Sequence, residues 1–539
     1  MTDYTRQTGL FTQLDALAAA VGATVDVGDG GPEARNAAVE SVTSDSRQAR
    51  PGDLFAATPG EKVHGAAFAV SAIEAGANAV LTDAQGRDIL RRDLGGRSVP
   101  VLVVDDPRAA VGKAAALILG EPAADLDSYA VTGTNGKTTT AYMVESILGA
   151  LGRKPGLIGT VEIRLAGMSV PAHLTTPMPD ELQSYLAFHR RGGGTDVVME
   201  TSSHALVQGR SDPVRFTVAG FTNLTQDHLD FHGTMERYYQ AKASLFTPER
   251  ARNAVVSVDG EYGRRLLAEC APRLEGEVAA LAVDSGLPDL PDGVVGWKAL
   301  AMEGSSFVLE STDGRRLATS TSLPGDFNVA NAALAAVMVM TAGYSPDELA
   351  RALPAGINPA VPGRMEVLNA RPRVIVDFAH NTEALVNAMK ALRPSTEGRL
   401  VVLTGSAGDR DKGKRPAMGA AVARYGDFVY ITDDDPHDED PAVIRAAVIE
   451  GTRGFDTPVV EIADRSQAID AAIAEASERD TILLAGRGHE TIQEVAGVPI
   501  ELDDRVEARR ALRKRARVHV RDSSVSLYGI SCRDETDFL

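Results

Sequence analysis

Cysteine is scarce in this chain, with only Cys270 and Cys532 among 539 residues. The two lie far apart and form no C-x-x-C pattern, so neither a disulfide framework nor a zinc site is expected. Long apolar runs are missing as well, since no stretch of about 18 residues is free of polar side chains. The N-terminus, M-T-D-Y-T-R-Q-T-G-L, lacks the basic region and apolar core of a signal peptide. We therefore expect a cytoplasmic protein without stable membrane contact.

Basic residues are outnumbered, with 55 Lys and Arg against 74 Asp and Glu, and the formal net charge is −19. This charge opposes nonspecific binding to nucleic acid and to anionic lipid, so a nucleic-acid partner is not expected. The length exceeds what one ordinary hydrophobic core supports and favours about three domains.

The most informative segment is A-V-T-G-T-N-G-K-T-T-T-A-Y-M-V-E-S-I-L-G-A-L, which begins at Ala130. A glycine loop with Lys137 and Thr138 joins a β-rich run to a helix, which is typical of a phosphate-binding loop. Gly133 and Gly136 let backbone N–H groups approach phosphate oxygens, the lysine supplies charge, and the threonine hydroxyl can bind Mg²⁺. The usual pattern has a further glycine where this chain has valine, so a turn without phosphate is the alternative. The apolar stripe of the following helix favours the phosphate loop.

Short apolar runs alternate with helical ones along the chain, which predicts an α/β fold. We expect three domains and a tail: residues 1–125 as a small α/β domain, 126–357 as a central phosphate-loop domain, 358–517 as a Rossmann-like domain, and 518–539 as a polar extension. The βαβ alternation of the central domain predicts a mostly parallel sheet with its ligand site at the carboxyl ends of the strands. The extension lacks helical or strand periodicity and is a candidate for disorder.

Two further segments of the central domain carry polar side chains suited to metal-dependent chemistry. Glu200 follows an apolar run, where its carboxylate could reach a metal bound to nucleotide phosphates. A solvated strand end is the alternative. The segment 222–246 places His228 in a turn with other histidines and aspartates, a density that favours metal or proton chemistry over packing.

Lys242 is expected on a helix, where its neighbours one turn away are Tyr238, Tyr239, Leu245 and Phe246. An ammonium group is poorly solvated on such a face. A neutral lysine there can act as a base or add CO₂ to become a carbamate, an oxygen ligand for Mg²⁺. The residues alone favour the alternative, in which the stem lies along the apolar face and the ammonium reaches water.

Ten motifs occur between Ser41 and Arg513: G-T-N-G-K-T, T-T-P, E-T-S-S-H-A-L-V-Q-G-R, D-H-L-D-F-H-G, Y-Y-Q-A-K-A-S-L-F, G-D-F-N-V-A-N, P-G-R-M-E, V-D-F-A-H, G-D-R-D-K-G-K-R-P and A-G-R-G-H-E. In this order they resemble the Mur ligase family, ATP-dependent enzymes that form amide bonds in peptidoglycan precursors. Within the family the chain is most similar to the MurE type, which joins a diamino acid to UDP-N-acetylmuramoyl-L-alanyl-D-glutamate. The resemblance implies ATP and Mg²⁺ as cofactors, these two substrates as partners, and domains for the UDP-substrate, for ATP and for the amino acid. We expect a monomer.

The resemblance also implies a role for each matching residue. The catalytic set is Lys137, Glu200, His228 and Lys242. Metal ligands are Thr138, Glu200, His228 and Lys242, the last as N6-carboxylysine. ATP-binding residues are Gly133, Thr134, Asn135, Gly136, Lys137, Thr138, Thr139, Asn328, Asn331, Arg364, Asp377 and His380. UDP-substrate-binding residues are Ser44, Ser46, His64, Thr175, Thr176, Ser202, Gln208 and Arg210. Because these residues are divided among domains, closure on the substrates is expected before chemistry.

Amino-acid-binding residues implied by the resemblance are Arg410, Asp434, Asp435, His437, Gly486 and Glu490. Enzymes of this type that use diaminopimelate commonly carry D-N-P-R where this chain has D-D-P-H, followed by three more acidic residues. The missing arginine would bind the distal carboxylate of diaminopimelate, and histidine cannot reproduce that bidentate geometry. An acidic loop suits a side chain that ends in ammonium. We therefore expect L-lysine or L-ornithine, with meso-2,6-diaminopimelate as the alternative.

Two other functions are more remote alternatives. A folate polyglutamate ligase shares the ATPase and C-terminal domains, but the additional N-terminal domain and the T-T-P segment argue against it. A nucleotide-binding scaffold without catalysis is disfavoured because Lys137, Glu200, His228 and Lys242 are all present.

Overall fold

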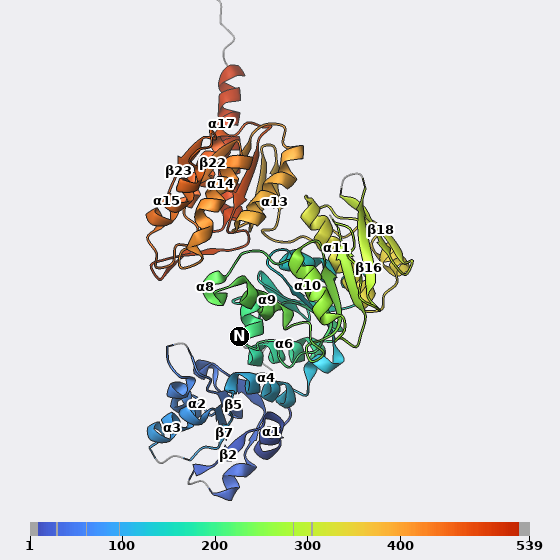
Figure 1. Ribbon diagram of the computed structural model, residues 1–539. Coiled ribbons are helices and arrows are strands. Elements are labelled where there is room, and N and C mark those ends of the chain that lie inside the picture. Colours follow the sequence, from blue (N-terminus) through green and yellow to red (C-terminus); the bar gives the residue numbers. More distant parts are fainter. Residues whose placement is uncertain are drawn as a thin grey trace, which may run out of the picture. The chain divides into compact units, whose positions relative to one another are not determined.

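The computed structural model of the chain describes residues 9–28, 31–60, 62–95, 98–283, 285–302 and 305–527, without the side chains of 32, 33 and 518–527. The described residues form two compact units (Figure 1). The first extends to Gln226 and includes His232–Ser322 and Phe327–Pro359. The second comprises Asp227–Phe231, Leu323–Asp326 and the chain from Ala360 onward.

The N-terminal part of the first unit has a five-stranded sheet in the order β2-β7-β6-β5-β4. Its strands are β2 (Thr24–Asp26), β4 (Ser41–Thr43), β5 (Asp53–Ala56), β6 (Ala79–Thr82) and β7 (Val101–Val103), parallel except between β2 and β7. Helices α1 (Leu14–Val21) and α4 (Pro107–Ile118) cover one face, and α2 (Ala69–Glu74) and α3 (Ala84–Asp93) cover the other. Strands β1 (Thr12–Gln13) and β3 (Ala38–Val39) form a separate antiparallel pair.

The central part of the first unit has an eleven-stranded sheet in the order β11-β10-β9-β12-β8-β13-β14-β15-β16-β17-β18. Its strands are β8 (Asp127–Thr132), β9 (Pro155–Ile158), β10 (Glu162–Leu165), β11 (Met168–Pro171), β12 (Asp196–Glu200), β13 (Phe216–Phe221), β14 (Ala251–Ser257), β15 (Val278–Ala282), β16 (Val295–Ala301), β17 (Ser306–Ser311) and β18 (Arg316–Ser320). From β9 to β16 neighbouring strands are parallel, and the outer pairs are antiparallel. The prediction of a mostly parallel sheet is confirmed.

The helices of this part are α5 (Lys137–Ala150), α6 (Pro179–Arg191), α7 (Ser203–Val207), α9 (Met235–Ala243), α10 (Glu261–Cys270), α11 (Asp326–Thr341) and α12 (Pro346–Ala352); the short α8 (Leu229–His232) precedes α9. Strand β8 lies between β12 and β13, with Val131 paired to Glu200 and Thr132 paired to Phe221. The loops that follow these three strands therefore begin side by side, as expected for the ligand-binding edge of a parallel sheet.

The C-terminal sheet has six strands in the order β19-β20-β24-β21-β22-β23. They are β19 (Glu366–Ala370), β20 (Arg373–Asp377), β21 (Leu400–Thr404), β22 (Phe428–Ile431), β23 (Val459–Glu461) and β24 (Thr481–Ala485), parallel except at β19. Helices α16 (Arg465–Glu475) and α17 (Asp504–Leu527) pack on one face. Helices α13 (Thr382–Leu392), α14 (Arg415–Tyr425) and α15 (Pro441–Thr452) pack against one another on the opposite side, and β25 (Ile492–Val495) and β26 (Val498–Glu501) form a hairpin. The predicted Rossmann-like α/β arrangement is confirmed.

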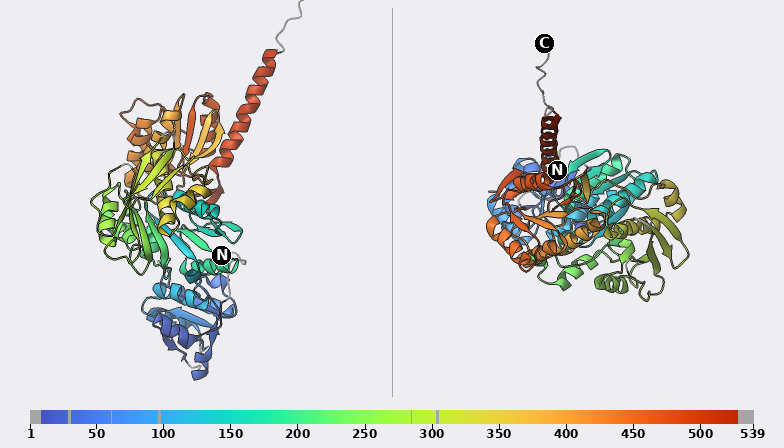
Figure 2. Two further views of the ribbon diagram at one scale, coloured as in Figure 1. Left: turned by 90° about the vertical axis from the view of Figure 1, so that its right-hand side faces the viewer. Right: turned by 90° about the horizontal axis from the view of Figure 1, so that it is seen from above.

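One expectation about the C-terminal end is wrong. Residues 518–527 were expected to lack helical structure, but α17 continues through them to Leu527 (Figure 2). Within 518–527 no two apolar residues stand three or four positions apart, so the sequence shows no helical period there. Residues 528–539 lie outside the described part of the chain. Among the described residues, no helix combines the length and apolar character needed to cross a membrane.

Candidate active site

Two glycines of the loop between β8 and α5 are required by close packing. Gly136 has φ 89°, and a Cβ there would lie 2.4 Å from Asn331 Oδ1. Gly133 has φ 148°, and a Cβ there would lie 1.8 Å from Thr222 Oγ1. Asn331 in turn accepts a hydrogen bond from Thr140 and donates one to Asn328 Oδ1, over 3.3 and 3.2 Å. The loop therefore packs closely against Asn331, which is hydrogen-bonded to Asn328, and both asparagines are expected to bind ATP.

Two lysines meet at one carbonyl oxygen of this loop. Lys137 Nζ donates to Gly133 O over 3.0 Å and to Thr134 O over 2.7 Å. Lys242 Nζ donates to the same Gly133 O over 2.7 Å. Lys242 is 1% exposed, and its Nζ lies 4.8 Å from the ring centroid of Tyr238. The apolar helical face predicted for Lys242 is thus present, and its amine points to the phosphate loop rather than to water.

Glu200, at the end of β12, accepts hydrogen bonds from a hydroxyl of the phosphate loop helix and from a neighbouring turn. Thr138 Oγ1 donates to Glu200 Oε2 over 2.8 Å. Thr160, in the turn after β9, donates its backbone N–H to Oε1 over 2.7 Å. Both Glu200 and Thr138 are buried. The alternative of a solvated strand end is excluded for this glutamate.

The residues at this point fit a Mg²⁺ ion with few protein ligands. In the part of the chain that the structure describes, no group of three or more His, Cys, Asp and Glu side chains could hold a metal ion. Mg²⁺ usually keeps several waters and binds through one or two carboxylates together with substrate phosphates. The Thr138 hydroxyl and the Glu200 carboxylate are hard oxygen donors at the start of a phosphate-binding helix, and they suit that ion.

Five residues expected to hold the UDP-substrate lie in a chain of hydrogen bonds that starts at Glu200. The Thr176 hydroxyl donates to the Glu200 carbonyl over 2.9 Å and accepts from the Ser202 N–H over 3.1 Å. Arg210 donates to the Thr176 carbonyl over 3.2 Å and to Gln208 Oε1 over 2.8 Å. Burial lowers the pKa of Arg210 from its ordinary value. The remaining member, Thr175, lies 3.1 Å from the Thr160 hydroxyl.

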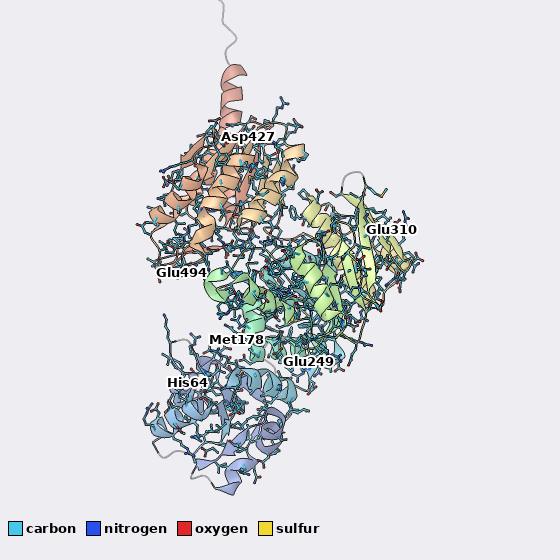
Figure 3. The ribbon with its side chains drawn as sticks, in the orientation of Figure 1. His64, Met178, Glu249, Glu310, Asp427 and Glu494 are labelled. Carbon is cyan, nitrogen blue, oxygen red and sulfur yellow. The ribbon has the colours of Figure 1, made fainter. Side chains whose placement is uncertain are left out.

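One loop of the N-terminal part binds an aspartate in the first turn of α6. Ser44 donates from both its backbone N–H and its hydroxyl to Asp180 Oδ2, each over 2.7 Å. Ser46 begins a short 3₁₀ helix directly after this point. His64, labelled in Figure 3, accepts from the Ala66 N–H over 3.0 Å and lies 3.2 Å from Asp83. Both nitrogens of His64 therefore already have partners within its own domain.

In the second unit, Asp227 gathers groups from three separate segments. His228 and His380 place Nε2 3.8 and 3.6 Å from its Oδ2, and Lys414 Nζ lies 3.8 Å from its Oδ1. Burial alone would raise the pKa of Asp227, but the hydrogen bond to His380 and the neighbouring cations outweigh burial and hold it below its ordinary value. Asp227 is therefore a buried anion that ties His228 and His380 to the segment carrying Lys414.

The other two nucleotide residues expected in this unit also lie together. The Arg364 guanidinium is 4.2 Å from the ring centroid of Phe378, whose ring packs against His380 at 4.6 Å. Asp377 ends β20 and accepts from the Met365 N–H over 2.7 Å. Burial raises the pKa of Asp377, although the charge of Arg364 opposes this shift.

The acidic run from Asp433 to Asp440 is largely neutralised by partners within the chain. Glu439 makes a bidentate pair with the buried Arg415, over 2.8 Å at each nitrogen. Asp440 caps the N-terminus of α15, and Asp433 pairs with Arg445. The argument from this run for an amino acid that ends in ammonium is therefore weakened, because three of its carboxylates already bind Arg415, Arg445 and the N-terminus of α15.

His437 also has partners. Its φ is 49°, its ring nitrogens lie 3.8 Å from Asp435 and 3.7 Å from Glu494, and its backbone pairs with the β25–β26 hairpin. Glu494 is labelled in Figure 3. The Asp435 carboxylate accepts from the Glu494 N–H over 2.6 Å, so the D-D-P-H loop is fixed to the hairpin.

Asp434, Gly486 and Glu490 surround the buried Arg487. Arg487 Nη1 lies 3.8 Å from carboxylate oxygens of both acids, and a Cβ on Gly486 would lie 2.4 Å from Asp434 Oδ2. Burial, with the charges of Asp434 and Asp435, raises the pKa of Glu490 to about 8 despite Arg487. Arg410 is exposed on the neighbouring loop, whose Gly408 N–H donates to the Asp435 carbonyl over 2.8 Å.

Sequence reasoning missed four residues that the structure places at these sites: Thr160, Asp227, Lys414 and Arg487. Asp227 stood in the His/Asp segment but had no visible partner, because His380 and Lys414 are far along the chain. Thr160 is an ordinary Gly-Thr turn after a strand, and only the pairing of β9 with β12 brings it to Glu200. Arg487 stands between Gly486 and Gly488, a loop pattern that could have drawn attention to it.

Comparison with known proteins places all three domains in one family. The Mur ligase family catalytic domain matches residues 38–118, the Mur ligase middle domain matches 131–339, and the Mur ligase glutamate ligase domain matches 363–488. A UDP-N-acetylmuramoyl-L-alanyl-D-glutamate–2,6-diaminopimelate ligase of Streptomyces coelicolor is 45% identical over 489 residues, 89% of this chain and 93% of the relative.

Two further similarities support that placement. A UDP-N-acetylmuramyl-tripeptide synthetase of Leifsonia xyli subsp. xyli is 41% identical over 479 residues, 87% of this chain and 90% of the relative. The solved structure of a UDP-N-acetylmuramoyl-L-alanyl-D-glutamate–2,6-diaminopimelate ligase matches with a TM-score of 0.63 and 29% identity, over 94% of this chain and 100% of that one.

Proposed function

This chain belongs to the Mur ligase family, and from that membership we propose that it joins 2,6-diaminopimelate to UDP-N-acetylmuramoyl-L-alanyl-D-glutamate in peptidoglycan precursor synthesis. Membership makes it an ATP-dependent amide ligase. The observation that carries the proposal is the arrangement of Lys137, Thr138, Glu200 and Lys242 around one phosphate loop. A scaffold without catalysis has no need to keep this set together.

ATP activation is needed because condensation of a carboxylate with an ammonium is unfavourable in water. The D-glutamyl carboxylate attacks the γ-phosphorus of ATP, the bond to the β-phosphate oxygen breaks, and an acyl phosphate and ADP form. The neutral amine of the amino acid then attacks the acyl carbon, and inorganic phosphate leaves as the amide forms. Bound Mg²⁺ would offset negative charge on the transferred phosphoryl group, and Thr138, Glu200, His228 and Lys242 are the residues proposed to hold it. Lys137, which donates to the loop carbonyls of Gly133 and Thr134, is proposed to turn toward the terminal phosphates.

Lys242 is proposed to carry a carbamate. Two ammonium groups on the Gly133 carbonyl repel each other, and the buried one, Lys242, is the one whose charge is least stabilised by water. Once the ammonium has lost a proton, the neutral amine can add CO₂ and release a second proton, which leaves an anionic carbamate beside Lys137 and the proposed metal. The helix that holds Lys242 provides an apolar wall but leaves its amine on the loop.

The proposed substrate contacts follow the chain of hydrogen bonds from Glu200. Thr175, Thr176, Ser202, Gln208 and Arg210 present hydroxyl, amide and guanidinium donors, which suit an anionic muramoyl-dipeptide and its diphosphate. Ser44, Ser46 and His64 are proposed to hold the uridine nucleotide. Asn328, Asn331, Arg364, Asp377 and His380 are proposed to complete ATP binding.

The expected preference for L-lysine or L-ornithine is not supported, and diaminopimelate is favoured instead. Relatives at 45%, 42% and 44% identity are named as 2,6-diaminopimelate ligases. The acidic run that favoured an ammonium is bound to Arg415, Arg445 and a helix N-terminus. Arg410, Asp434, Asp435, His437, Gly486 and Glu490 are proposed to bind the amino acid.

The decisive experiment measures phosphate release from ATP with the UDP-linked dipeptide and each of meso-2,6-diaminopimelate, L-lysine and L-ornithine. Diaminopimelate should give the highest kcat/KM. Faster turnover with lysine or ornithine would refute the proposed amino acid, and no ATP-dependent turnover with any of them would refute the ligase function. Replacement of Lys242 by alanine should remove most activity, and a short-chain carboxylic acid should restore part of it. Near-normal turnover of that variant in CO₂-depleted buffer would exclude the carbamate.

A further inference from the structure

The turn after β9 holds the Glu200 carboxylate at both oxygens. The Thr160 N–H donates to Oε1 over 2.7 Å, and the Thr160 hydroxyl lies 3.1 Å from Oε2. A Cβ on Gly159 would lie 2.5 Å from Oε1, so the turn approaches more closely than any side chain would allow. Because Glu200 is 1% exposed, its orientation is set by Thr160 and Thr138 rather than by water.

The Thr160 hydroxyl stands between two acceptors. Glu200 Oε2 and Thr175 Oγ1 each lie 3.1 Å from Thr160 Oγ1. A hydroxyl has one proton and two lone pairs, so it can donate to only one of the two at a time. Thr175 and Glu200 therefore compete for the one hydrogen bond that the Thr160 hydroxyl can donate.

We propose that Thr160 is a positioning residue that couples occupancy of the UDP-substrate site to binding of the divalent cation at Glu200. In the free enzyme, the Thr160 hydroxyl divides its one hydrogen bond between Thr175 Oγ1 and Glu200 Oε2. When Thr175 donates a hydrogen bond to an anionic oxygen of the substrate, Thr175 Oγ1 becomes the better acceptor and keeps the hydrogen bond from Thr160. One lone pair of Glu200 Oε2 is then released to the cation. The inference rests on the proposed function for the assignment of Thr175 to substrate and Glu200 to metal.

The coupling should be moderate and reciprocal. One hydrogen bond to a carboxylate is exchanged, so substrate should tighten cation binding by about 3- to 10-fold. Cation should tighten substrate binding by the same factor, because the two effects form one thermodynamic cycle. Thr160→Ser keeps the hydroxyl and should keep the coupling. Thr160→Val keeps the shape and the backbone N–H but removes the hydroxyl, and the coupling factor should fall to about one.

The test is a Mn²⁺ titration followed by electron paramagnetic resonance, with β,γ-imido-ATP present and with or without the UDP-linked dipeptide. The matched control is Thr217→Val, which loses a hydroxyl that accepts from the Ser128 N–H over 3.0 Å at the opposite end of β8. This control should couple like the wild type. Gly159→Ala provides a second variant, since its Cβ displaces Glu200 Oε1 and should weaken Mn²⁺ binding both with and without substrate.

Three outcomes would overturn the inference: a wild type without coupling, a Thr160→Val enzyme with the full coupling, or a Gly159→Ala enzyme with unchanged Mn²⁺ affinity. Failure of the proposed function looks different. If calorimetry shows no binding of the UDP-linked dipeptide to the wild type, the assignment of substrate is wrong. If the dipeptide binds and is turned over but Mn²⁺ affinity does not respond, only the role of Thr160 is wrong.

Discussion

The phosphate-loop region and the amino-acid region solve opposite electrostatic problems. Around the loop, one buried carboxylate, Glu200, is surrounded by hydroxyl and N–H donors, and two lysines share a carbonyl. Around the D-D-P-H loop, charged side chains are paired with each other, as in Glu439 with Arg415. The first region is left with donors and one anion that a phosphate and a cation can complete. In the second region, most charged side chains are already paired within the chain and hold its own loops in place.

This difference explains why the sequence pattern predicted the phosphate loop, whereas the number of acidic residues did not predict which amino acid is favoured. A glycine loop and its lysine act through local backbone geometry, so the sequence pattern itself carries the function. The role of an acidic run depends on the groups that pair with its carboxylates in the folded chain, and sequence spacing does not reveal those groups. The contrast makes definite predictions for substitutions in each region.

The largest effect is expected at the phosphate loop. Lys137→Ala should lower kcat by on the order of 1,000-fold, because a charge aimed at the transferred phosphoryl group is removed. Affinity for the UDP-linked dipeptide without ATP, measured by calorimetry, should be nearly unchanged. Lys113→Ala, an exposed lysine on α4, is the control. A large loss of dipeptide affinity in Lys137→Ala would show that the two binding functions are not divided as proposed.

An intermediate effect is expected at Asp227. Its charge is paired within the chain, but two of its partners, His228 and His380, are proposed to bind metal and ATP. Asp227→Asn keeps the shape and removes the anion that holds His228, His380 and Lys414, so kcat/KM for ATP should fall about 10- to 100-fold. The exposed Asp230 lies on the same segment, and Asp230→Asn is the matched control. Thermal unfolding should be measured in parallel. A fall in melting temperature without a change in KM for ATP would make Asp227 a purely structural residue.

The fold and the phosphate loop could be predicted from the sequence because they depend on local patterns. Apolar runs identified β12 and β13, and glycines with Lys137 identified the loop. The helix through 518–527 could not be predicted, since no two apolar residues in that stretch of sequence stand three or four positions apart. Neither could the partners of Glu439 or Thr160, because pairing of distant strands and loops brings them together. The sequence shows that Glu439 is an acid and Thr160 a hydroxyl donor, but it does not show which side chain each of them binds.

A smaller effect tests whether the acidic run is structural. Glu439→Gln should lower the free energy of unfolding of the C-terminal domain by about 3 kcal/mol, since it leaves Arg415 buried without its carboxylate. The Arg415 pair also lowers the pKa of Glu439 to about 2, so its contribution should persist at neutral pH and be lost as the pH falls toward that value. Asp438→Asn, at an exposed position, should change stability little. A Glu439→Gln enzyme of normal stability but altered preference between diaminopimelate and lysine would instead indicate that this run interacts with the amino acid.

The smallest effect concerns Glu490, whose pKa is raised to about 8 by burial and by the charges of Asp434 and Asp435. At pH 7 its carboxyl is mostly protonated in the free enzyme, and an ammonium beside it would favour ionisation. Binding of the amino acid should therefore release up to one proton at pH 7 and fewer as the pH rises above 8. Calorimetry in buffers of different ionisation enthalpy measures this number, and Glu490→Gln corrects for protons lost by the amino acid itself.

The raised pKa also means that the folded state holds a proton that the unfolded state loses, so stability should fall as the pH rises from about 4.5 to 8. Glu490→Gln should flatten that slope. Equal proton release by wild type and variant would place the amine away from Glu490 and leave the region's charges wholly structural.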